Sequence, residues 1–294
     1  MLTQVYQSRT TVDWQDVSLL GIDVGFSKTN ATTGVAVYER GALRSLCCVQ
    51  SSPEDRAAVL RRDFKFDAVA IDGPILPRLA DFKLKRHCES LLIGRGFHNR
   101  CKPGMSHHGF GLDLRAATRP IADESCLLTK TVSKHFGDRQ VRFSIPLVEA
   151  FPNAFLGVLL DDIDYEEMGR VSRGARFDRL YERAVVKGRT AVLFDQLGWK
   201  CPEICNAIKN EVSKNGRAAH EKRAALVCLL TAACALAGKA EYVGDTAGGW
   251  ICLPPKELWA GWAHQALETR KMKLECRSNK DVDGRDNHGH HALD

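Results

Sequence analysis

Three acidic residues lie at or near the ends of segments with the character of buried strands, and they are the side chains best placed to do chemistry. Asp23 ends the segment 17–23, Asp72 ends the segment 67–72, and Glu149 lies within 147–151. The carboxyl ends of parallel neighbouring strands meet at one edge of an open α/β sheet, where such sheets bind ligands. The pattern predicts a carboxylate cluster there, if the three strands are adjacent.

A cluster of carboxylates repels itself unless a positive charge lies between its members, and divalent metal ions usually supply that charge. Mg²⁺ prefers a few carboxylates together with water and phosphate oxygens, and Mn²⁺ suits similar ligands. Two such ions roughly 3.5–4 Å apart can activate a water and stabilise the leaving oxygen of a phosphodiester. The alternative is that each acid only stabilises a turn, as Asp72-Gly73 and Glu149 near Pro152 would allow.

The elements that must position these acids can be read from hydrophobic patterning. Strands are predicted at 34–39 and 42–50, with Gly41 in a hairpin turn between them, and Ser52-Pro53-Glu54 opens a helix to about residue 64. A mostly helical region follows Pro152 and contains the uncharged apolar segment 224–237, which suits a buried helix. A last short strand at 248–253 and a last helix at 256–273 complete the prediction.

These elements predict an α/β fold with a mixed sheet, in which a three-stranded antiparallel start is followed by parallel strands and helical insertions. We expect a single domain over residues 1–275, with a basic helical insert at about 78–140. Residues 276–294 are polar and end in a histidine-rich stretch, so we expect a disordered tail there.

Composition excludes several classes of protein. With 294 residues, 44% of them hydrophobic and 27% charged, the chain is ordinary for a soluble globular protein. No segment is long and apolar enough for a membrane span, and residues 1–16 lack the apolar core of an export signal. The 11 cysteines include no Cys-x-x-Cys pair. We therefore expect a cytoplasmic protein with reduced thiols and no membrane partner.

The positive charge is concentrated next to the predicted carboxylate edge. Residues 78–119 hold nine basic and three acidic residues, an excess equal to the formal charge of +6 of the whole chain. A basic insert that follows Asp72 would suit a phosphodiester or nucleic-acid substrate, although a solvated helical face is an equal alternative. The residues that we expect to bind substrate are Lys28, Arg86, Arg95, Arg100, Lys102 and Arg176.

Two other groupings favour structural roles. The arginines between 170 and 183 recur at helical spacing, and a surface of ion pairs with Asp178 and Glu182 is favoured there over phosphate binding. Histidines and cysteines crowd between residues 87 and 108, but their irregular spacing does not favour a zinc site.

The order strand–Asp, hairpin, helix, strand–Asp, strand–Glu resembles the ribonuclease H-like fold. More specifically, the chain resembles domain-of-unknown-function family 429, a group regarded as ribonuclease H-related nucleases. The matching segments are Gly21-Ile22-Asp23, Ala70-Ile71-Asp72-Gly73-Pro74, Arg86-His87-Cys88-Glu89, Val148-Glu149-Ala150-Phe151-Pro152, Gly174-Ala175-Arg176, Ala225-Leu226-Val227-Cys228 and Gly244-Asp245 with Gly249-Trp250-Ile251.

The resemblance implies a hydrolase that cuts phosphodiester bonds with Mg²⁺ or Mn²⁺, in a suspected two-metal site. The catalytic and metal-holding residues would be Asp23, Asp72, Glu149 and Glu221. The chain departs from the family at its late helix, where Glu221-Lys222-Arg223-Ala224-Ala225 stands in place of an Asp-x-x-Asp-Ala pattern. Ala224 therefore leaves Glu221 as the candidate acid of that helix.

Two other classes of function remain open from the sequence. The segment from Gly21 to Gly25, followed by Ser27 and Thr29, is similar to the first phosphate loop of kinases and ATPases of the actin and sugar-kinase superfamily. The chain is short for the two domains of that superfamily, and no second phosphate loop is evident. A non-catalytic nucleic-acid-binding module with the same fold is the other alternative, because Ala224 replaces one acid. The metal-dependent nuclease is the predicted function.

Overall fold

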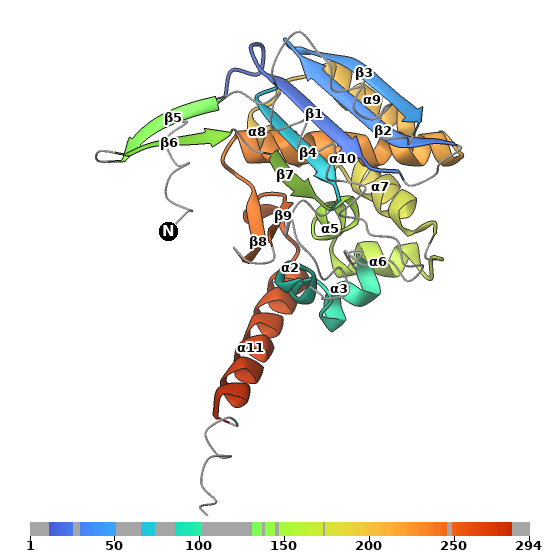
Figure 1. Cartoon of the computed structure of the whole chain (residues 1–294). Coiled ribbons are helices and arrows are strands. Elements are labelled where there is room, and N and C mark those ends of the chain that lie inside the picture. Colours follow the sequence, from blue (N-terminus) through green and yellow to red (C-terminus); the bar gives the residue numbers. More distant parts are fainter. Residues whose placement is uncertain are drawn as a thin grey trace, which may run out of the picture.

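A seven-stranded mixed sheet forms the centre of the protein (Figure 1). The computed structural model describes residues 12–25, 30–50, 66–73, 86–101, 131–136, 139–144, 147–172, 174–245 and 249–283. The strands follow the order β3-β2-β1-β4-β7-β9-β8 across the sheet. Their bounds are β1 Ser18–Asp23, β2 Ala31–Glu39, β3 Ala42–Gln50, β4 Ala68–Asp72, β7 Leu147–Ala150, β8 Glu241–Asp245 and β9 Gly249–Leu253.

The directions of the strands confirm the predicted mixed α/β sheet. Strands β1, β2 and β3 form an antiparallel start, and β1, β4, β7 and β9 are mutually parallel neighbours. The predicted hairpin between β2 and β3 turns at Arg40 and Gly41, which have φ angles of +48° and +81°. Positive φ at both turn residues matches the right-handed twist of the two strands and therefore favours a tight hairpin.

Helices and a separate hairpin surround this sheet. The hairpin consists of β5 Thr131–Phe136 and β6 Arg139–Ser144. The described helices are α2 His87–Leu91, α3 Arg95–Arg100, α5 Pro152–Gly157, α6 Asp162–Met168, α7 Arg176–Val186, α8 Arg189–Leu197, α9 Pro202–Val212, α10 Arg217–Leu236, the 3-10 helix η1 Lys256–Leu258 and α11 Gly261–Asp283. None of those in the described part of the chain is long and apolar enough to cross a bilayer.

The observed elements differ from the predicted ones in three places. The insert at 78–140 is not wholly helical, because β5 and the start of β6 lie in it; alternation of β-branched and aromatic residues with polar ones favours strands there. Helix α11 continues to Asp283, into the expected tail, and no Gly or Pro interrupts the chain between Gly261 and Gly284. Strand β8, which was not predicted, borders the sheet. The predicted helix at 52–64 lies outside the described residues.

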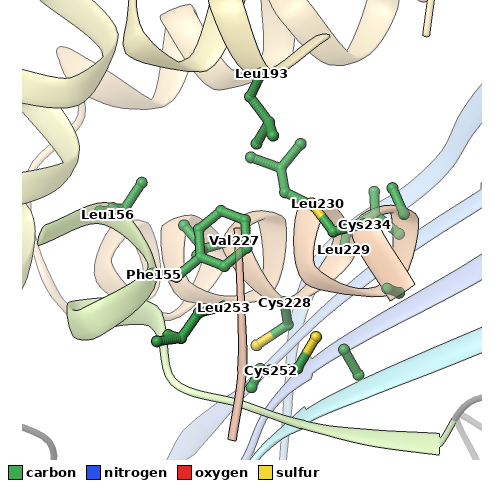
Figure 2. Packing of buried hydrophobic residues seen from close by; sticks show 14 of the residues in the cluster. Phe155, Leu156, Leu193, Val227, Cys228, Leu229, Leu230, Cys234, Cys252 and Leu253 are labelled. Carbon is green, nitrogen blue, oxygen red and sulfur yellow. The ribbon is translucent and has the colours of Figure 1, made fainter. Parts of the chain in front are cut away.

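Helix α10 covers one face of the sheet and packs against β1, β2, β3, β4, β7 and β9. Side chains alternate between the two faces of a strand, so β1 and β4 each contribute residues to two hydrophobic clusters. Leu19, Ala70 and Val148 belong to the cluster beneath α10, whereas Leu20 and Ile71 belong to the cluster on the opposite face. Figure 2 shows residues of α10 gathered with residues of α5, α8 and β9 in the first cluster.

Two glycines allow α10 to lie unusually close to the sheet. A Cβ atom on Gly21 of β1 would lie 2.3 Å from the backbone nitrogen of Leu229, and one on Gly34 of β2 would lie 2.1 Å from the carbonyl oxygen of Glu221. Both clashes are with helix backbone, which has no rotamer that could relieve them. The distance between α10 and the first two strands therefore depends on these two glycines.

We expect Gly21→Ala to lower the free energy of unfolding by about 3 kcal/mol, because overpacking against backbone forces the helix to move. Denaturant unfolding followed by circular dichroism measures this effect. Gly174→Ala is the matched control, since a Cβ at Gly174 meets nothing within 4 Å, and it should change stability by less than about 0.5 kcal/mol. Equal stability of the two variants would contradict the close approach of α10.

Candidate functional site

Asp23 and Asp72 lie beside each other at the carboxyl edge of the sheet. They are register partners across the parallel strands β1 and β4. Alternation places both on the face covered by α10, since Gly21 and Ala70, two residues earlier, are packed beneath that helix. Asp23 is only 9% exposed, and Asp72 is partly buried. The predicted meeting of these two acids is therefore present in the fold.

Helix α10 adds a third carboxyl group. Glu221, in the second turn of the helix, is buried and shares a side-chain hydrogen bond with Asp23. The Nε of Arg217 also donates to Glu221 Oε1 at 3.2 Å, from a position one turn earlier. Gly34, the ladder partner of Asp23, is the residue whose missing Cβ makes room for the backbone of Glu221. The close packing of α10 is thus what joins Glu221 to the strand-end acids.

Asp23 and Asp72 hold protons more tightly than free carboxyl groups do. Burial, the hydrogen bond with Glu221 and the negative charge of Asp72 raise the pKa of Asp23 well above its usual value. Burial and the charges of Glu149 and Glu221 raise the pKa of Asp72 to about 7, against a weaker opposing effect of His220. Such a group is stabilised either by protons or by a cation, because buried like charges repel.

Glu149 is bound by Arg86 and does not join the other three acids as predicted, although its charge still acts on Asp72. Its register partner is Ile71, not Asp72, so it lies one step back from the edge. Its neighbours Val148 and Ala150 pack beneath α10, which turns Glu149 to the opposite face. A difference of one residue in the pairing of β4 with β7 therefore separates Glu149 from the ladder position beside Asp72.

Arg86 neutralises Glu149 in a buried ion pair. Its Nη1 and Nη2 donate to the two oxygens of Glu149 at 2.7 and 2.6 Å, and its Nε donates to Glu89 Oε1 at 2.9 Å. All three side chains are at least 94% buried. Arg86, expected to bind substrate, is thus enclosed between two carboxylates, a geometry that the sequence did not suggest.

Of the other residues expected to bind substrate, Arg95, Arg100 and Arg176 lie on helices α3 and α7. Arg95 is exposed on α3. Arg100 is ion-paired with Asp162 of α6, and Arg176 of α7 donates to the carbonyl oxygen of His98 at 3.4 Å. Lys28 and Lys102 lie outside the described residues.

A polar bridge between α7 and α10, which sequence reasoning missed, supports the helix that carries Glu221. Asp178 of α7 accepts from Arg223 Nη1 at 2.7 Å and lies 3.0 Å from Nδ1 of His220. The hydrogen bond with Asp178 raises the pKa of His220. His220 precedes Glu221 directly, and adjacency to a candidate acid was the one signal that could have drawn attention to it.

The donor set suits a hard divalent cation, although the side chains do not already form a cage for one. Within the described ranges, no three His, Cys, Asp or Glu residues are arranged to hold a metal ion. Asp23, Asp72 and Glu221 nevertheless offer carboxylate oxygens, the ligands that Mg²⁺ and Mn²⁺ prefer. The hydrogen bond between Asp23 and Glu221 and the raised pKa values of Asp23 and Asp72 fit a cluster of acids that exchanges protons for a cation.

Comparisons of the chain with protein-family models, with curated proteins and with solved structures found no match.

Asp72→Asn should stabilise the protein at high pH when a chelator is present. The folded state binds this proton with a pKa of about 7 against 3.8 for an ordinary aspartate, so stability falls as the pH rises from about 4 through 7. The asparagine variant lacks this loss and should exceed wild type by on the order of 4 kcal/mol at about pH 9, and by almost nothing near pH 4.

Denaturant unfolding across this pH range measures the difference. Asp195→Asn, a change of an exposed aspartate on α8, is the matched control and should follow wild type throughout. Parallel curves for wild type and Asp72→Asn would show that the proton is not held by this carboxyl group.

Arg86→Met should destabilise the fold by about 3–5 kcal/mol, because it removes a buried guanidinium that is ion-paired with Glu149 and Glu89. The double variant Arg86→Met/Glu149→Gln should recover part of this loss, since it also removes the buried charge of Glu149. Thermal and denaturant unfolding measure both. Lys271→Met, which breaks the exposed pair with Glu268, should cost less than about 1 kcal/mol. A similarly small cost for Arg86→Met would refute the structural role of this ion pair.

Proposed function

We propose that the protein is a divalent-metal-dependent nuclease of the ribonuclease H-like superfamily, related to domain-of-unknown-function family 429. The observation that carries the proposal is the cluster of three carboxyl groups, from Asp23, Asp72 and Glu221, at the carboxyl edge of the sheet. Phosphodiester hydrolysis is the chemistry that such a group, loaded with Mg²⁺ or Mn²⁺, serves best.

The sheet topology supports the same proposal. An antiparallel start, β3-β2-β1, is followed by the parallel strands β4 and β7, and the two aspartates end the central pair β1 and β4. This is the arrangement that the resemblance to the ribonuclease H-like fold implies. A ligand at this edge would meet the acids directly, because open α/β sheets bind ligands outside the carboxyl ends of their strands.

In the proposed site, Asp23, Asp72 and Glu221 hold the cation, and Glu149 does not. Bound divalent ions would supply an activated water and stabilise the leaving oxygen. Asp23 would have to lose its proton to hold a cation, and its pKa is raised, so affinity for the metal should fall at low pH. Arg86 binds both oxygens of Glu149, so this carboxylate is engaged by Arg86 and not by the cation, and the ion pair fixes the end of β7.

The proposal predicts that Mn²⁺ stabilises the wild-type protein against heat and that Asp23→Asn abolishes this effect. A ligand at about 100 times its dissociation constant stabilises by about 2.7 kcal/mol, a shift of several degrees in Tm. Cleavage of labelled DNA and RNA oligonucleotides with Mn²⁺ should likewise fall by at least about 100-fold in Asp23→Asn, Asp72→Asn and Glu221→Gln, since each removes a ligand charge.

Asp195→Asn serves again as the matched control and should retain both the shift and the cleavage. Glu149→Gln separates this site from one that uses all four acids: it should lower stability but leave the Mn²⁺ shift in place. A shift with Mg²⁺–ATP alone would favour the kinase alternative and refute the nuclease. Binding of oligonucleotides without any cleavage would favour the non-catalytic module.

A further inference from the structure

Helices α3, α6 and α7 enclose a pocket of about 300 Å³ that the proposed function does not use. Arg100 joins α3 to α6 through Asp162, and Arg176 joins α7 to α3 through the His98 carbonyl. In Figure 1, α3 and α6 lie below α5, and α7 lies to the right of it. The residues that line the pocket include Arg100, Arg170, Arg176, Arg179, Tyr165 and Met168. We call this the arginine pocket.

The lining of the arginine pocket carries an excess of positive charge. Arg100 is paired with Asp162, and Arg179 is paired with Glu182 at 2.8 Å. Neither Arg170 nor Arg176 has a carboxylate partner among the residues that the structure describes, and none of the described lining residues is acidic. Four guanidinium groups around one hollow, two of them uncompensated, form a strong attraction for an anion.

The guanidinium of Arg100 is held in place by two aromatic rings. The Arg100 guanidinium lies 4.6 Å from the ring centroid of Trp262 and 5.4 Å from that of Tyr165, so two aromatic rings fix its plane. Its Nε is buried and has no hydrogen-bond partner within the described part of the chain. The guanidinium of Arg100 is therefore held in one orientation at the wall of the arginine pocket.

The size and the remaining walls define the class of ligand. A volume of about 300 Å³ is at the lower limit for small-molecule sites. Met168 and Val171 add apolar surface, which suits the organic part of an ester better than a free inorganic ion. Arginine forks match phosphate oxygens in pairs, which makes phosphate the anion of choice.

We propose that the arginine pocket binds a phosphate ester, with Arg100, Arg170 and Arg176 on its oxygens. Phosphate binding here does not depend on the metal site. We favour a nucleic-acid strand as the source of this phosphate, one that extends to Asp23, Asp72 and Glu221. That assignment rests on the proposed function. The link between the two is α7, which carries Arg176 and, two residues later, Asp178, the partner of His220 and Arg223 on α10.

The test measures binding of AMP, glucose 6-phosphate, adenosine and a labelled single-stranded oligothymidylate to the full chain in EDTA. Wild type should bind the phosphate esters and not adenosine. Arg170→Gln/Arg176→Gln should bind them at least about tenfold more weakly, because two charge-assisted hydrogen bonds are lost. Arg44→Gln is the matched control, an exposed arginine on β3 away from the pocket, and should bind as wild type does.

Three results would overturn the proposal: no phosphate ester binds, adenosine binds as tightly as AMP, or the double variant keeps wild-type affinity while melting at the wild-type temperature. Oligothymidylate bound at least about tenfold more tightly than AMP supports a strand as the source, because a strand offers several phosphates. Equal affinity overturns that assignment. Asp23→Asn should still bind AMP and glucose 6-phosphate even though it loses the Mn²⁺ shift. Failure of the phosphate site and failure of the metal site can therefore be told apart.

Discussion

The close packing of α10 on β1 and β2 is the constraint on which the rest of this structure depends. Gly21 and Gly34 carry no Cβ where the helix backbone passes, and any larger side chain at either position would meet that backbone within 2.3 Å. The same approach that buries the core of the helix also brings Glu221 to Asp23. Core packing and the candidate site are therefore set by one helix–sheet distance.

Electrostatics divides the acids of this edge into two groups. Glu149 is neutralised by Arg86 on one face of the sheet, and its burial therefore serves stability. Asp23, Asp72 and Glu221 gain less from arginine: among the described residues Arg217 pairs with Glu221, and the raised pKa values of Asp23 and Asp72 reflect the cost of their burial. A fold usually keeps such unfavourable burial where function requires it.

Positively charged side chains lie on α7 and on the first half of α10. Asp178 of α7 pairs with His220 and Arg223 of α10, and α7 also contributes Arg176 and Arg179 to the arginine pocket. Acids together with arginines on neighbouring helices suit a polyanionic substrate, because the cations attract its phosphates and the acids bind the metal. The proposed nuclease and the proposed phosphate site are consistent with each other for this reason.

The sequence by itself determined the strands β1, β2, β3, β4, β7 and β9, the hairpin turn at Gly41 and the end positions of Asp23 and Asp72, because alternation and turn residues are local signals. Only the tertiary structure decided which acids meet. The register between β4 and β7 turned Glu149 toward Arg86, and two glycines brought Glu221 to Asp23. Pairing register and helix–sheet distance depend on residues far apart in the chain, and no local pattern encodes them.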